Sequence, residues 1–201
     1  MRRPSGICPD DKRLDDHGHD QCGCDTDDRH AHSDDPRTTT ATTNCPAGGQ
    51  WGTGMAYRSE MSQSRLVAVR IGRHDCYDRI VFDVDGPAPV GYTVGYVPMV
   101  YSDAKGDPLP VRGGATLEVV VRAVERGADG SGPVLAGVGD QLYPVSQLAS
   151  WTSLRAIRFA GYFEGQCTFA VGVRDKTPFR VFTMLDPAGR VREFVLDVAV
   201  A

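Results

Sequence analysis

From residue 66 onward, apolar and polar positions alternate in short runs that are separated by turn-forming residues. Alternation with a period of two, with Gly and Pro at the breaks, is typical of strands that bury one face. Residues 115–124 give the clearest case, because this run is rich in β-branched side chains. The pattern predicts strands over residues 66–72, 79–85, 91–101, 115–124, 154–162, 168–174, 179–185 and 191–200.

Helical periodicity is nearly absent, and only residues 145–151 are compatible with a short helix. Closely spaced strands with Gly/Pro turns predict an all-β fold, either a β-sandwich or a flattened barrel of about eight mostly antiparallel strands. The missing strand–helix–strand spacing argues against nucleotide-binding α/β folds. The Gly-rich segment 111–115 is followed by no helix, so we interpret it as the entry to a tight hairpin.

The first fifty residues have a different composition. Aromatic residues and Glu are absent before Gln50, and the segment contains a Thr-rich run. A segment of such low hydrophobicity cannot bury enough surface to offset its chain entropy. We therefore expect a disordered, acidic, His- and Cys-containing tail over residues 1–50 and one folded domain over residues 51–201.

Charge divides in the same way. Six Lys/Arg and ten Asp occur through Cys45, so the tail carries the whole formal net charge of −4 and the remainder is neutral. A neutral domain lacks the basic patch that nucleic acid requires, so we expect no nucleic-acid partner. No apolar run is long enough to span a bilayer, and no apolar signal-peptide region is visible after the first residues.

The tail has two further interpretations. Its bias towards Arg, Asp, His and Thr is typical of an upstream region translated from a start codon placed too early, in which case Met55 or Met61 is the native start. It also contains residue types that bind zinc or copper, but their spacing matches no standard zinc finger, so we expect no metal. These residues form three close pairs, His17 and His19, Cys22 and Cys24, and His30 and His32.

The chain has six cysteines, and two of them, Cys76 and Cys167, lie well inside the domain. An even number is compatible with disulfides but does not give the pairing. Our preferred pair is Cys45–Cys76, and Cys76–Cys167 is the alternative. Closing a loop of about thirty residues would stabilise the fold by about 3 kcal/mol in the chain-entropy treatment, and it would require an oxidising compartment.

The domain contains no recognisable catalytic set. A nucleophilic triad needs a His base with an orienting acid, and His74 is the only histidine after the tail. One histidine cannot supply the ligands of a metallohydrolase. Glu118 and Glu164 are available as a carboxylate pair, but a sandwich surface commonly carries such residues. We therefore expect no enzyme, no cofactor and no metal; a hydrolase would need His74 in a pocket beside a carboxylate.

Residues 73–79 gather charged and aromatic side chains between two apolar strands. One interpretation is a salt-bridged turn with a cysteine as structural anchor. The other is a recognition surface, because Arg binds carboxylates in a bidentate manner and Tyr stacks on sugar rings. On the second interpretation the candidate binding residues are Arg73, His74, Asp75 and Tyr77.

Tyr92 and Tyr96 share one face of a predicted strand, and they form an aromatic platform if that face is exposed. A stripe of this kind is more often part of a core. Arg174 and Arg180 lie near the ends of neighbouring predicted strands and add positive charge to the candidate surface. Alternatively, they are edge charges that prevent pairing with another chain.

Five stretches of the domain stand out as motifs: GRHDCYDRIVFD (72–83), GYTVGYV (91–97), VRGGA (111–115), FAGYFEGQ (159–166) and PFRVF (178–182). In this order they resemble the actinobacterial AMIN-like domain family. A short segment, WGT at 51–53, is similar to one usually found just upstream of this domain. Together these segments extend the resemblance over nearly all of residues 51–201.

The family takes its name from the AMIN module of cell-wall amidases, a β-sandwich that localises proteins to the cell envelope and is thought to contact peptidoglycan. The resemblance implies a secreted or cell-envelope protein that binds peptidoglycan or an envelope protein without catalysis. One alternative is a carrier that holds a small apolar or lipid ligand between its sheets. A hydrolase is the less favoured alternative.

Overall fold

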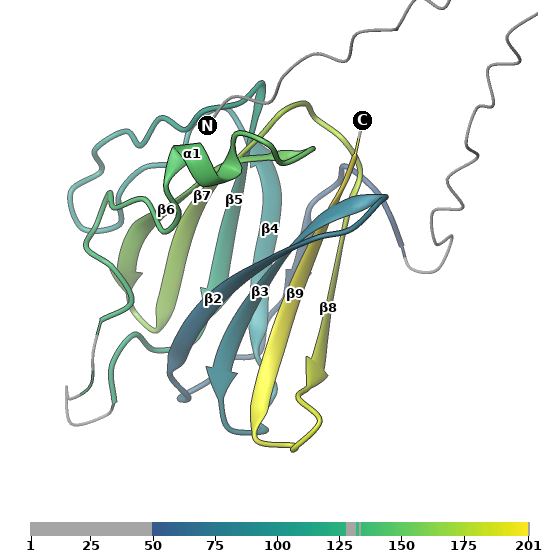
Figure 1. Ribbon diagram of the computed structural model, residues 1–201. Helices are drawn as coiled ribbons and strands as arrows, with labels where there is room; N and C mark the ends of the chain where they lie inside the picture. The colour runs from purple at the N-terminus through teal and green to yellow at the C-terminus, as the bar shows by residue number, and fades with distance from the viewer. Residues whose placement is uncertain (1–49, 128–131, 133, 201) are drawn as a thin grey trace, which may run out of the picture. The chain divides into compact units, whose positions relative to one another are not determined.

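The computed structural model describes residues 50–127, 132 and 134–200. Within these residues, nine strands form two antiparallel sheets, and the one helix is short (Figure 1). The five-stranded sheet has the order β1-β4-β5-β7-β6 and the four-stranded sheet the order β2-β3-β9-β8. The predicted all-β sandwich is thus confirmed, whereas residues 1–49 lie outside the described residues.

The observed strands follow the predicted ones closely, with one addition. The predicted run 91–101 ends at residue 97, before Pro98, because proline cannot donate to the ladder. The added strand, β1, is three residues long and is too short to produce an alternating pattern. The elements are β1 Ala56–Arg58, β2 Leu66–Arg73, β3 Tyr77–Asp85, β4 Gly91–Val97, β5 Ala115–Arg122, α1 Val145–Leu148, β6 Leu154–Phe163, β7 Gln166–Val173, β8 Phe179–Leu185 and β9 Val191–Ala199.

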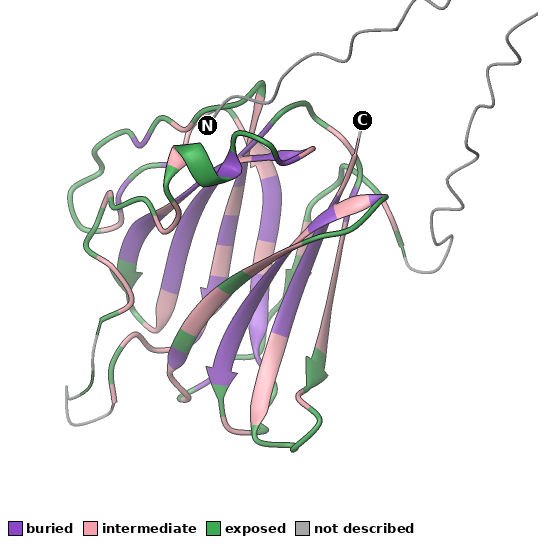
Figure 2. Ribbon diagram, viewed as in Figure 1, coloured by how far each residue is buried: buried purple, intermediate pink, exposed green. Residues whose placement is uncertain are grey.

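The core lies between the inner faces of the two sheets, where Figure 2 shows the strands buried over most of their length. Aromatic rings join the sheets directly. The ring of Phe82 lies 5.0 Å from that of Phe169 in the opposite sheet, and Phe194 stacks on Tyr92 at 4.6 Å. Phe82 and Phe194 also contact each other within their sheet, at 5.3 Å. These four rings therefore fill the space between the sheets where β3 and β9 face β4 and β7.

A buried carboxylate adds a polar link between the sheets. Asp78 of β3 is fully buried, and its Oδ2 accepts hydrogen bonds from the backbone N–H groups of Ser153 and Leu154, at 2.6 and 2.9 Å. Leu154 begins β6 in the other sheet. Asp78 therefore fixes the start of β6, which no sequence pattern indicated.

The long connection between β4 and β5 covers part of the outer face of the five-stranded sheet. Val100 and Leu109 pack on Ala160 and Ala170, which point away from the main core. Gly172 permits this close approach, because a Cβ atom there would collide with the carbonyl oxygen of Arg112. In contrast, no described segment crosses the outer face of the four-stranded sheet in Figure 1.

The described residues form no helix with the length and apolar character of a membrane span.

We predict that Phe82→Ala lowers the free energy of unfolding by about 3–5 kcal/mol, because the substitution leaves a cavity where the sheets meet. Phe163→Ala is the matched control, since Phe163 is 57% exposed, and it should change stability by less than about 1 kcal/mol. Urea denaturation of both variants tests this. Equal losses would show that the inter-sheet rings do not hold the sandwich together.

Candidate functional site

A cross-strand row of charges lies on the outer face of the four-stranded sheet. Asp197 of β9 stands directly opposite Arg79 of β3 on one side and Arg180 of β8 on the other. Inner and outer positions alternate along a strand, so a residue between the core residues Leu196 and Val198 must point outward. The row therefore results from strand register.

The row is held by close ion pairs. Arg79 is bidentate, with Nε 2.6 Å from Asp197 Oδ1 and Nη2 2.9 Å from Oδ2. Arg180 Nε lies 2.8 Å from Oδ2. Asp197 is fully buried, while the side chains of Arg79 and Arg180 are 24% and 14% exposed. The hydrogen bonds to Asp197 raise the pKa of Arg79. One carboxylate therefore serves two guanidinium groups.

Aromatic rings surround the two guanidinium groups. The guanidinium carbon of Arg180 lies 4.7 Å from the ring centre of Trp51 and 5.2 Å from that of Tyr77. Arg79 lies 5.2 Å from the same Tyr77 ring. His74 stacks on Tyr77 with ring centres 4.4 Å apart. We call this group the Arg–aromatic cluster; its members are Trp51, His74, Tyr77, Arg79, Arg180 and Asp197.

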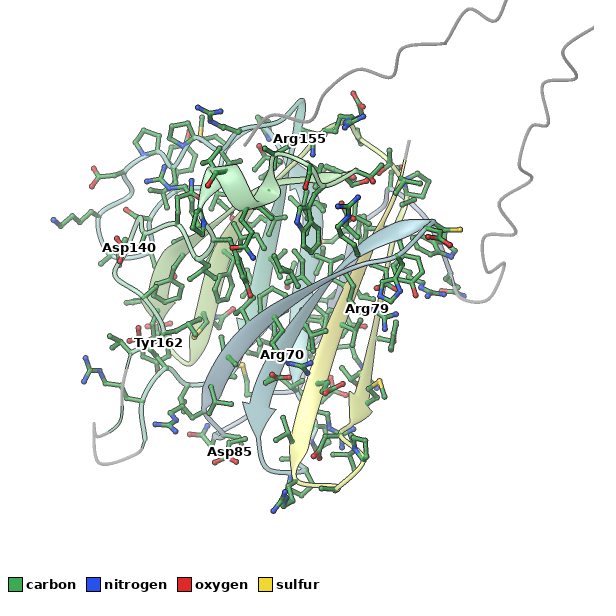
Figure 3. All side chains as sticks on the ribbon, in the orientation of Figure 1. Arg70, Arg79, Asp85, Asp140, Arg155 and Tyr162 are labelled. Carbon is green, nitrogen blue, oxygen red and sulfur yellow. The ribbon has the colours of Figure 1, made fainter. Side chains whose placement is uncertain are left out.

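A second, more exposed group of charges lies farther along the same face. Arg70 forms two hydrogen bonds with Asp83, at 2.6 and 2.8 Å, and one with Glu193, at 2.7 Å. Asp83 and Glu193 stand directly opposite each other, so Arg70 separates two like charges. Figure 3 labels Arg70 and Arg79 on this open face. Since the Arg70 side chain is 53% exposed, this group is more strongly screened than the Arg–aromatic cluster.

A hollow of about 430 Å³ adjoins the cluster. It lies between the chain that leads into β1 and the first residues of β8. Trp51 and Arg180 contribute to both the hollow and the cluster, and Met55 and Tyr57 line its other side. Trp51 is held in place because Gly52 exchanges two backbone hydrogen bonds with Phe179, at 3.0 and 2.8 Å.

Of the four binding residues predicted in the loop 73–77, two belong to the Arg–aromatic cluster. Tyr77 is half-buried inside the cluster, and His74 is exposed on top of it. Arg73 and Asp75 are exposed beside them. The interpretation as a salt-bridged turn does not describe this segment, because Arg79 pairs with β9 rather than within the turn.

The predicted tyrosine platform is not formed. Tyr92 is only 8% exposed and stacks on Phe194 in the core. Tyr96 is half-buried, and its hydroxyl donates a 2.7 Å hydrogen bond to the carbonyl oxygen of Thr177. The strand carries both rings on its inner side, so the exposed platform was wrong and the core interpretation was right. Tyr92 also lines the hollow beside Trp51, so its role as a binding residue stays a prediction.

Arg174 is exposed in the turn that follows β7, outside the cluster. Its backbone N–H donates to Ser153, and its carbonyl oxygen accepts from Gly114. Nothing in these contacts connects Arg174 with the Arg–aromatic cluster. The cation that joins the cluster from this part of the chain is instead Arg180.

The hydrolase alternative requires His74 in a pocket beside a carboxylate, and the structure shows where these residues lie. His74 is exposed, with its ring against Tyr77 rather than in a pocket. Glu118 of β5 and Asp103 of the β4–β5 connection line a hollow of about 220 Å³ on the five-stranded sheet, away from His74. Burial raises the pKa of both carboxyl groups. Glu164 lies in the exposed turn between β6 and β7. The histidine and the carboxylates are therefore not assembled into one site.

Residues suited to metal binding do not cluster in the described ranges: no group of three or more His, Cys, Asp or Glu side chains is placed to hold an ion. The paired His and Cys residues of the tail lie outside the described residues, so their interpretation is untested.

The cysteine pairing is decided in part. Cys167 is a free, buried thiol, so the alternative pair Cys76–Cys167 is wrong. Cys76 is disulfide-bonded. Its expected partner, Cys45, lies outside the described residues, and the Cys45–Cys76 pairing stays a prediction.

Sequence reasoning missed Trp51, Arg79 and Asp197 as members of the site. Trp51 was noticed only as part of an upstream segment. Arg79 and Asp197 are 118 residues apart, and only strand register brings them together. An acidic residue between the apolar positions 196 and 198 of a terminal strand was the one available signal.

We predict that Asp197→Asn lowers the free energy of unfolding by about 3–5 kcal/mol, because two partly buried guanidinium groups lose their shared counter-charge. Glu193→Gln is the control on the same strand and face. Its partner Arg70 is 53% exposed, so the loss should stay below about 1 kcal/mol. Denaturant unfolding measures both. A small effect of Asp197→Asn would mean that the row contributes little to stability.

We predict that Cys167 resists alkylation in the folded protein. Burial raises its pKa to about 12, and the thiolate is the reactive form, so at pH 8 about one molecule in ten thousand is ionised at this site. Iodoacetamide should modify Cys167 only after denaturation, as measured by mass spectrometry of its peptide. Rapid modification without denaturant would contradict the buried placement.

The chain was compared with known proteins in three ways, and one comparison gave a match. Searches of the curated proteins and of the solved structures each returned no significant match. The family model described as AMIN-like domain matches residues 64–200, which is more than half of the chain and covers β2 to β9. The protein therefore belongs to the AMIN-like domain family.

Proposed function

We propose that this domain is a non-catalytic binding module of the cell envelope and that the Arg–aromatic cluster is its binding surface. Membership of the AMIN-like family supports a non-catalytic role related to the cell wall. The observation that carries the choice of surface is the pair of guanidinium groups held by Asp197 and flanked by Trp51 and Tyr77.

Peptidoglycan is the ligand that this chemistry favours. Its stem peptides carry carboxylates, which guanidinium groups bind well, and its glycan rings offer faces that stack on aromatic side chains. The cluster supplies two guanidinium groups and aromatic rings within about 6 Å of them, a distance typical of cation–π contacts. The hollow beside Trp51 gives such a ligand a concave place to bind.

The exposed residues Arg73, His74 and Asp75 form the rim of the proposed surface. His74 extends the aromatic face, since its ring stacks on Tyr77. Arg73 adds a second, solvent-exposed guanidinium group for a carboxylate. An envelope protein with acidic side chains would meet the same features and is the second kind of partner that this rim allows.

The alternative of a carrier is less well supported. A carrier needs space between its sheets, whereas here Phe82 touches Phe169 and Phe194 touches Tyr92 across that space. The hydrolase alternative is weakened by the separation of His74 from the Asp103 and Glu118 carboxyl groups.

We further propose a secreted or envelope-associated location. The family suggests it, and the disulfide bond of Cys76 is of a kind that persists in oxidising compartments. Cys45 is the proposed partner, because the bond would tie the segment before Trp51 to the loop beside the cluster. Peptide mapping without reducing agent should recover a linked peptide that contains residues 45 and 76; any other linkage would exclude this pairing.

We predict that purified peptidoglycan retains the full-length protein and that Trp51→Ala weakens retention at least tenfold. A tenfold change corresponds to about 1.4 kcal/mol, which is within the range of a cation–π contact and a stacked ring together. Co-sedimentation with increasing amounts of peptidoglycan gives the apparent affinity of each variant.

Tyr162→Ala is the matched control, because Tyr162 is an aromatic residue 38% exposed at the end of β6 in the other sheet (Figure 3). It should bind as the unmodified protein does. Equal weakening by both substitutions would remove the case for the cluster. If the unmodified protein is not retained above the level of an unrelated sandwich protein, the peptidoglycan proposal fails.

A further inference from the structure

The outer face of the five-stranded sheet carries two poles of opposite charge. Glu118, Val120 and Arg122 of β5 all point outward, because the residues that alternate with them belong to the core. Glu118 lies beside the β4–β5 connection, whose Asp103 lines the same hollow. Arg122 lies at the other end of this row, four residues or about 13 Å along the strand. A carboxylate and a guanidinium group therefore mark the two ends of one outward row.

Arg122 forms the positive pole. Its guanidinium group donates to Gln166 Oε1 at 3.2 Å, to Thr93 Oγ1 at 3.4 Å and to the Arg58 carbonyl oxygen at 3.2 Å. These acceptors are neutral, and no carboxylate of the described residues forms an ion pair with Arg122. The ring centre of Tyr57 lies 5.2 Å from the guanidinium carbon, and Tyr57 is 59% exposed. These contacts fix the guanidinium group without neutralising its charge.

Asp103 and Glu118 form the negative pole, in the hollow of about 220 Å³. Asp103 is hydrogen-bonded to Thr168, but its Oδ2 is buried and has no hydrogen-bond partner among the described residues. Glu118 pairs with no described cation, and the charge of Asp103 adds to burial in raising its pKa. A buried acceptor without a donor is costly. A basic group that enters the hollow therefore gains hydrogen bonds as well as charge pairing.

The floor between the poles is apolar and small. Val120 lies between them on β5, and Thr93 of β4 and Thr168 of β7 stand directly beside it. Phe163 of β6 lines the hollow and is 57% exposed. The strands that carry Phe163 and Tyr57, β6 and β1, are the two edge strands of the sheet. Aromatic rings therefore bound this floor on both sides. We call it the two-pole surface; its members are Tyr57, Asp103, Glu118, Val120, Arg122 and Phe163.

We propose that the two-pole surface binds an extended peptide segment of a partner protein, with a basic and an acidic side chain four residues apart. Alternate side chains of an extended chain point to one side, so the first and fifth are about 13 Å apart. This equals the spacing of Glu118 and Arg122 along β5. The basic side chain pairs with Asp103 and Glu118, the acidic one pairs with Arg122, and the side chain between them packs on Val120.

Charge complementarity selects this occupant. An uncharged glycan would leave both poles without a counter-charge, and a metal ion or a purely acidic ligand would satisfy only one of them. A carboxylate in the ligand matches the forked donors of a guanidinium group. The two-pole surface lies on the opposite sheet from the Arg–aromatic cluster, and its ligand is a protein segment. This proposal and the peptidoglycan proposal can therefore fail separately.

NMR titration of the full-length protein with the blocked peptide Ac-KTVTE-NH2 tests the proposal, because it locates a ligand that binds with a dissociation constant of about 1 mM. We expect the signals of residues 118–122 to shift and those of Tyr77 and Arg79 to stay. Removing either charge, in Ac-QTVTE-NH2 or Ac-KTVTQ-NH2, should weaken binding about tenfold. Ac-TKVET-NH2, whose charges are only about 7 Å apart, should be weakened as much.

Glu118→Gln tests the surface from the side of the protein. The substitution nearly preserves shape and removes a charge that has no described counter-charge, so the fold should be kept. The dissociation constant of Ac-KTVTE-NH2 should rise about tenfold, whereas that of Ac-QTVTE-NH2, which lacks the basic group, should not change further. Glu193→Gln is the matched control, because it removes one carboxylate from the outer face of the other sheet. It should leave the binding of both peptides unchanged.

Three results would overturn the proposal. The first is the absence of binding at about 5 mM Ac-KTVTE-NH2. The second is a set of shifted signals that centres on Tyr77 and Arg79 instead of β5. The third is equal weakening by Glu118→Gln and Glu193→Gln, which would show attraction to the net charge of the protein without a defined site.

Discussion

The contact between aromatic rings of opposite sheets is the constraint on which the rest of the structure depends. Phe82 on Phe169 and Phe194 on Tyr92 bring the sheets together and exclude water between them. Because alternate residues of a strand point to opposite faces, burying these rings forces their strand neighbours outward. The outward row that includes Asp197 is therefore a consequence of the core, and a register slip of one residue would move both together.

That dependence links the stability of the fold to the geometry of the proposed binding surface. Asp197 is fully buried although it lies on an outer face, because the side chains of Arg79 and Arg180 and the aromatic rings beside them cover it. A buried charge is tolerated only when its partners are in place. The guanidinium groups are thus held in one position by the fold itself, which would lower the entropy cost of the proposed binding. More exposed charges, such as Arg70, do not have this restraint.

The strands could be predicted from the sequence because each one buries a single face, so that the run 179–185 was placed without error. β1 could not, since its three residues are paired only through a distant strand. Alternation showed that Tyr92 and Tyr96 share a face, but the identity of that face depends on which sheet lies opposite. The site was harder still, because Asp197 meets Arg79 only through pairing between segments far apart in the chain.

The close approach of the β4–β5 connection at Gly172 makes the two outer faces of the sandwich different. The β4–β5 connection packs over part of the outer face of the five-stranded sheet, whereas no described segment crosses the outer face of the four-stranded sheet. A side chain at position 172 would collide with the backbone of Arg112 and push this connection away, which would expose Ala160 and Ala170 to water and remove the difference between the two outer faces.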